Sequence, residues 1–110
     1  MAETRNWRLG ETTSKQLENF VEQMLKSAST MELAGKAQTV ANEVIITHLM
    51  FEQYFIRNSS YACVSIEWVR TAEQTTISAI SAGGSQGLLN IDWGSSGNML
   101  DKVERVLKKL

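Results

Sequence analysis

Two segments of the chain repeat apolar residues with the period of an amphipathic helix. The first runs from about 14 to 28, and its apolar face comprises Leu17, Phe20, Val21, Met24 and Leu25. Thr13 and Gln16 have the spacing of a capping box, which satisfies backbone N–H groups at a helix start. The second follows a loop at 94–98, and its apolar positions are Leu100, Val103, Leu107 and Leu110. We therefore predict one helix near each end of the sequence.

Between these helices the pattern changes to the two-residue alternation of β-strands. The alternation is weak over 31–38, where Gly35 suggests a bulge or a bend, and clearer over 61–70, and 75–82 is rich in residues that favour strands. In the segment 43–57 both alternating faces carry apolar side chains, a pattern typical of a central strand covered on both sides. We therefore expect about four strands to follow one another as an antiparallel meander.

Two shorter segments complete the expected sheet. Trp7 and Leu9 indicate a short opening strand, and 88–93 reads as a last strand after the glycine-rich stretch 83–87. The sequence predicts a single α+β domain over residues 1–110. Its fold class is an antiparallel sheet of about four to five strands with two amphipathic helices, in the order β-α-β-β-β-β-α.

Composition narrows the range of partners and compartments. The 110 residues suit one domain, and the net charge of -1 offers no positive field for a nucleic acid. The single cysteine, Cys63, suits a reducing compartment, and we expect a cytoplasmic protein. We expect no signal peptide, because the first ten residues lack an apolar stretch, and no membrane span, because the most apolar segment, 44–56, contains polar residues.

Two polar loops are candidates for ligand contact. The run Gly83-Gly84-Ser85-Gln86-Gly87 can present successive backbone N–H groups to an anion, and it can equally be a hairpin connection. Arg57, with the Asn-Ser-Ser that follows it, can clamp a carboxylate or phosphate, and the same residues also suit a plain turn. Both alternatives stay open at this point.

Other reactive side chains do not assemble into a catalytic or metal site. His48 lacks the neighbouring ligands that metal sites require and is too far along its strand from Glu52 to form a dyad. Cys63 reads as a buried small side chain, and the tryptophans and tyrosines read as core or cleft packing. We predict no catalytic residue, no metal and no cofactor, so an enzyme is not expected.

The segments FEQYFIRNSS at 51–60 and SAISAGGSQG at 78–87, followed by Asp92-Trp93-Gly94, resemble a family of small bacterial proteins known only as a domain of unknown function. The shared patterns are FExYxxRNSS and SAIxxGGxQG, and the resemblance extends over about 44–107. It implies a compact bacterial domain, cytoplasmic in setting, with no established activity.

The chain is expected to be a non-enzymatic module that binds a small molecule or an anion. Strands 43–57 and 75–82 should run in the same direction, so that the loops after them meet at one end of the sheet. The side chains or backbone expected there are those of Arg57, Tyr54, His48, Gln86, Gly83 and Gly84. The alternative is a protein-interaction module, in which a second apolar sheet face is buried in a homodimer or by another protein.

Overall fold

The computed structural model describes residues 2–56, 59–84 and 95–110. Within these residues the elements follow the predicted order β-α-β-β-β-β-α. They are β1 (Ala2–Leu9), α1 (Ser14–Lys26), β2 (Met31–Ala41), β3 (Val44–Phe55), β4 (Ser60–Arg70), β5 (Thr75–Gly84) and α2 (Ser95–Leu107). The α+β fold class is therefore confirmed, and the strand expected at 88–93 lies outside the described residues.

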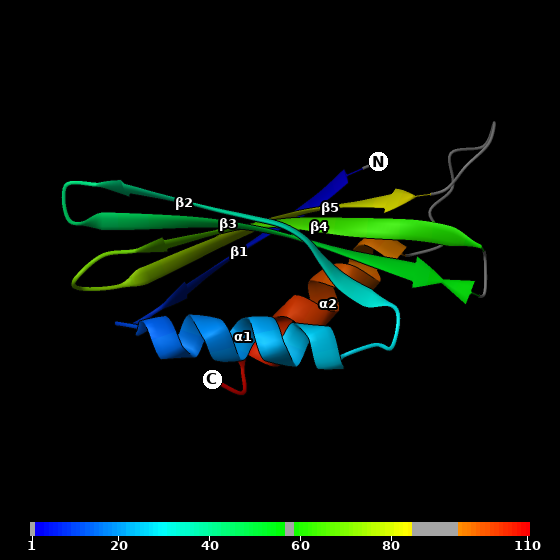
Figure 1. Ribbon diagram of the computed structural model, residues 1–110, viewed down its shortest axis with the longest axis horizontal. Coiled ribbons are helices and arrows are strands. Elements are labelled where there is room, and N and C mark those ends of the chain that lie inside the picture. Colours follow the sequence, from blue (N-terminus) through cyan, green and yellow to red (C-terminus); the bar gives the residue numbers. More distant parts are fainter. Residues whose placement is uncertain (1, 57–58, 85–94) are drawn as a thin grey trace.

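The strands form one antiparallel sheet of five strands in the order β1-β5-β4-β3-β2. β2 to β5 make the expected meander, and β1 returns to pair with β5 at the opposite edge. Both helices lie on the same face of the sheet (Figure 1). The described residues therefore form two layers, and neither of their helices lies on the other face of the sheet.

Helix α1 begins where its sequence predicts and packs on the sheet through Phe20. Thr13 accepts a hydrogen bond from the Gln16 backbone N–H at 3.2 Å, and the Gln16 side chain accepts one from the Thr13 N–H at 2.9 Å. The buried ring of Phe20 lies 6.3 Å from the Phe51 ring and 5.3 Å from the Trp68 ring, centroid to centroid. Leu25, however, is 38% exposed, so the apolar face extends one position beyond the part of it that is buried.

Two backbone irregularities shape the long hairpin of β2 and β3. The pairing register shifts between Leu33 and Gly35, where the sequence predicts a bulge or a bend. At the turn that joins the strands, Asn42 has a φ of 56°, a left-handed conformation that asparagine tolerates better than most residues. In Figure 1 the turn of this hairpin lies beyond the end of α1.

The expectation that strand 43–57 is covered on both sides is wrong. β3 is one strand from the edge of the sheet, and on the face away from the helices His48 and Met50 are exposed. On the other face Leu49 and Phe51 are 1% and 0% exposed. Because both helices pack on one face, the apolar side chains of the second face remain at the surface.

Among the described residues, no helix is both long and apolar enough to cross a membrane.

Candidate functional site

The structure brings together two of the residues predicted to bind a ligand. β3 and β5 run in the same direction with β4 between them, as expected. Tyr54 is the pairing partner of Tyr61, which in turn pairs with Gly84, so these residues form one row near one end of the sheet. Gly83 precedes Gly84 on β5, whereas Arg57 and Gln86 lie outside the described residues. Their contribution to a site stays a prediction.

His48 does not belong to that row. It lies six positions before Tyr54 on β3, which corresponds to roughly 20 Å of strand. Its partner across the sheet is Glu67, and the His48 Nε2 atom lies 3.7 Å from the Glu67 Oε2 atom, with both side chains about half exposed. The structure therefore places His48 in a surface pair, away from the glycines.

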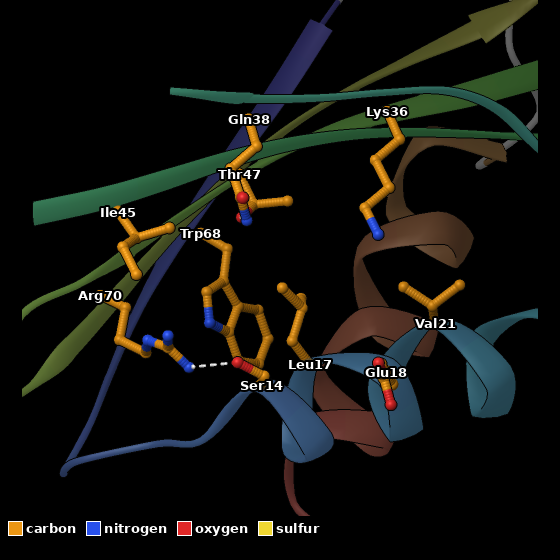
Figure 2. A pocket seen from close by; sticks show the side chains of 10 residues that line it. All are labelled: Ser14, Leu17, Glu18, Val21, Lys36, Gln38, Ile45, Thr47, Trp68 and Arg70. Carbon is orange, nitrogen blue, oxygen red and sulfur yellow. Dashed lines mark hydrogen bonds between the residues drawn. The ribbon is translucent and has the colours of Figure 1, made fainter. Parts of the chain in front are cut away.

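A hollow of about 270 Å³ lies elsewhere, between α1 and the helix-facing side of β2, β3 and β4. We call it the α1 groove. Figure 2 shows the side chains that line it, with those of α1 facing those of the strands. They are Ser14, Leu17, Glu18, Val21, Lys36, Gln38, Ile45, Thr47, Trp68 and Arg70.

Strand register explains why these side chains meet. Thr47 pairs with Gln38 on one side and Trp68 on the other, so the three side chains share one row on the helix-facing surface. Ile45 and Arg70 pair in the next row, toward the end of the hairpin. The α1 residues come from successive turns of its N-terminal half, since positions three and four apart share a helix face. The groove is thus built by regular elements.

The indole of Trp68 is the unusual group in the groove. Trp68 is 1% exposed, and its Nε1 atom has no hydrogen-bond partner among the residues that the structure describes. The indole nitrogen of Trp7, by contrast, donates to Glu104 Oε1 at 3.1 Å. A buried N–H without an acceptor costs about 1–3 kcal/mol, so the Trp68 N–H is a site where an acceptor would be stabilising.

The groove also carries charge that is not neutralised by close pairs. Arg70 Nη1 donates to Ser14 Oγ at 3.2 Å, and Gln38 Nε2 donates to Thr47 Oγ1 at 3.1 Å. Within the described part of the chain, Arg70, Lys36 and Glu18 form no ion pair. The lining therefore combines two cations, one carboxylate and several hydrogen-bond donors with apolar side chains.

A second hollow of about 240 Å³ lies between the C-terminal part of α1 and α2. Burial, and secondarily the charge of Arg105, lower the pKa of Lys102 in its wall. Lys102 Nζ already donates to Gln53 Oε1 at 2.6 Å and lies 5.4 Å from the centre of the Phe55 ring. Since Lys102 has these partners, this hollow presents a weaker case for a ligand than the α1 groove.

Cysteine and metal chemistry contribute no candidate among the described residues. Cys63 is a free thiol, half-buried on the face of the sheet that carries no helix. No group of three or more histidine, cysteine, aspartate or glutamate side chains in the described part of the chain is arranged to hold a metal ion.

Sequence reasoning missed the α1 groove although one signal was present. Ala62, Val64, Ile66 and Trp68 alternate as the buried face of β4, and Arg70 continues the same alternation. A cation at a core-facing position needs a partner or a route to solvent. That position could have marked a polar opening in the core, whereas the partners from α1 and β2 depend on tertiary packing.

Searches of curated proteins and of solved structures found no match. A family model matches residues 1–110, and the family that it describes has no assigned function. The expected resemblance to a family of unknown function is thereby confirmed, and the two sequence patterns that suggested it stay predictions. The chain belongs to the family of unknown function DUF6054.

Proposed function

We propose that this protein is a non-enzymatic module that binds a small molecule in the α1 groove. The observation that carries the proposal is the buried indole N–H of Trp68, which has no acceptor among the described residues. Ligand sites in proteins combine apolar walls with a few polar groups that fix orientation. The α1 groove has this composition, with Leu17, Val21 and Ile45 beside Arg70.

Binding is favoured over catalysis by the chemistry of the lining. General acid–base catalysis near neutral pH commonly uses histidine, and nucleophilic catalysis commonly uses an activated serine or cysteine. The described lining holds neither histidine nor cysteine, and its Ser14 hydroxyl contacts Arg70 rather than a base.

The lone Cys63 still favours a reducing compartment, and we propose that the protein works in the cytoplasm.

A thermal-shift screen tests this proposal. The wild-type protein is heated with a panel of organic acids, amines, sugars, amino acids and nucleotides, and at least one compound is expected to raise the melting temperature by mass action. The variant Val21→Trp fills the groove and should lose that shift. Leu25→Trp is the matched control, since Leu25 lies one turn further along the same helix and outside the groove lining. A panel without any stabilising compound, or equal shifts in both variants, contradicts the proposal.

A second candidate function is self-association through the face of the sheet that carries no helix. Met50, Tyr61 and Ile80 are 43%, 53% and 54% exposed, and their pairing partners place them on that face. Five strands about 4.8 Å apart and about eight residues long present roughly 600 Å². Two such faces bury about 1,200 Å², the lower end of stable protein interfaces, so we propose a second copy of the chain as the partner.

Light scattering over a range of protein concentrations tests this second proposal. A dimer is expected, and Ile80→Lys should convert it to a monomer because the charge would be buried at the interface. Val40→Lys is the control, since Val40 is 63% exposed but pairs with Ile45, on the helix-facing side. A monomeric wild type at high concentration excludes the dimer, and equal dissociation by both variants excludes this face as its interface.

A further inference from the structure

We infer that the ligand of the α1 groove carries a carboxylate, bound between Arg70 and the indole N–H of Trp68, on an apolar body, with about ten non-hydrogen atoms in the whole ligand. This inference rests on the proposed function and names the chemical class of the ligand. It follows from the distribution of charge, donors and apolar side chains along the groove.

The charges are distributed unevenly between the two ends of the groove. In Figure 2, Arg70 and Ser14 lie at one end, and Lys36 and Glu18 lie toward the other. The opposite charges of Lys36 and Glu18 offset one another, so the net positive charge of the groove lies with Arg70. A monoanion is therefore attracted to the Arg70 end.

The hydrogen-bond donors are gathered at the same end. The indole nitrogen of Trp68 lies on the edge of its ring that is turned toward Arg70 and Ile45 (Figure 2). The guanidinium group offers several N–H donors in a plane, and carboxylate oxygens fit that arrangement closely. One carboxylate can thus accept from Arg70 and give the Trp68 N–H its acceptor.

Access to the indole nitrogen requires a small side-chain movement. The Nε1 atom exposes less than 1 Å², so an acceptor meets it only after a neighbour shifts. Arg70 is held to Ser14 by one long hydrogen bond of 3.2 Å at the surface. Such a bond contributes little, and a charge-assisted bond from Arg70 to a carboxylate is stronger. The anion itself therefore provides the free energy for the movement.

The apolar part of the groove sets the size of the ligand. Apolar side chains from both layers line the groove, Leu17 and Val21 from α1 and Ile45 from β3, so the ligand needs an apolar part that contacts them. A cavity of about 150 Å³ holds benzene, so by proportion the 270 Å³ of the groove holds about ten non-hydrogen atoms. Phenylacetate has this size and a single carboxylate, and it serves as the probe.

The experiment compares three probes of nearly equal shape and different charge, by titration followed in ¹H–¹⁵N spectra of the whole chain. They are phenylacetate, phenylacetamide and 2-phenylethylamine. We expect phenylacetate to shift amide signals of α1 and β3 and to bind at least tenfold more tightly than the amide, with the weakest binding by the amine. If the amide or amine binds as tightly as phenylacetate, the carboxylate inference is overturned while binding in the groove stands. If none of them binds, the inference is likewise overturned, and the broad thermal-shift panel decides the proposed function separately.

Two pairs of variants separate the binding role from a general effect of charge or packing. Arg70→Gln should weaken phenylacetate binding roughly tenfold or more, because it removes a charge-assisted hydrogen bond. Arg8→Gln, which removes the same charge from the other face of the sheet, should leave the affinity unchanged. Trp68→Phe should weaken binding, and Trp7→Phe should not, because the Trp7 N–H already has its acceptor. Folding is checked by circular dichroism, and equal losses in Arg70→Gln and Arg8→Gln overturn the inference.

Discussion

Replacing Phe20 by alanine tests the packing of α1 most severely. The ring is 0% exposed and contacts the rings of Phe51 and Trp68 at centroid distances of 6.3 Å and 5.3 Å. Truncation of a buried phenylalanine costs about 3–5 kcal/mol, and the loss of two aromatic contacts places this site in the upper part of that range. Domains of this size have a free energy of unfolding of about 5–15 kcal/mol. We therefore expect Phe20→Ala to lose a large share of the stability of the domain.

Urea unfolding followed by far-ultraviolet circular dichroism measures this loss. Leu25→Ala is the matched control, because Leu25 belongs to the same apolar pattern and is 38% exposed. It should cost less than about 1 kcal/mol, in line with substitutions at partly exposed positions. If Phe20→Ala unfolds at the same urea concentration as the wild type, or Leu25→Ala is equally destabilised, the described packing of α1 is wrong.

Three further substitutions test local features of the fold. Thr13→Ala removes the hydroxyl of the capping box and should lower the free energy of unfolding by about 1 kcal/mol, whereas Thr13→Ser should retain it. At Asn42, where φ is 56°, Asn42→Val should destabilise by about 1–2 kcal/mol and Asn42→Gly should not; equal melting temperatures would contradict the turn. The pKa of Glu104 is lowered, mainly by the hydrogen bond from Trp7. The Glu104 carboxylate therefore stabilises the fold at pH values above the ordinary carboxyl pKa, and this contribution is lost as the pH falls through the pKa of the folded state. Trp7→Phe should raise that pKa, measured by carbon-13 titration of the Glu104 carboxyl group, and an unchanged pKa would count against the contact.

Most of the fold could be predicted because each helix and strand has its own periodic pattern of apolar residues. The stripe that contains Phe20, the alternation that ends at Trp68 and the spacing of Thr13 and Gln16 each reflect one element or one cap. Consecutive strands that are joined by short connections are then expected to pair as antiparallel neighbours. The pairing of β1 with β5 is a long-range contact, for which the sequence of either strand contains no comparable signal.

The functional site was harder to predict, since it depends on how elements cross. The sequence places a ligand site at two loops, and the structure does bring Tyr54 and Gly84 into one row near them. The α1 groove lies elsewhere, because a helix and three strands form it rather than loops. The expectation that β3 is covered on both faces failed because apolar residues on two faces do not reveal where the helices pack. The sequence predicts core or cleft packing for Trp68, and the structure places it in the core, but whether its indole N–H finds an acceptor is decided by tertiary structure.

The indole ¹H–¹⁵N signal of Trp68 gives the most direct measurement of the central claim. This signal is assigned with Trp68→Phe, and that of Trp7 with Trp7→Phe, in the wild-type chain titrated with phenylacetate. A new hydrogen bond moves the Trp68 indole proton downfield, while the Trp7 indole, already bonded to Glu104 at 3.1 Å, stays in place. A downfield shift confined to Trp68 is the result that we predict. A Trp68 indole signal that does not move, while amide signals elsewhere do, would contradict an acceptor site in the α1 groove.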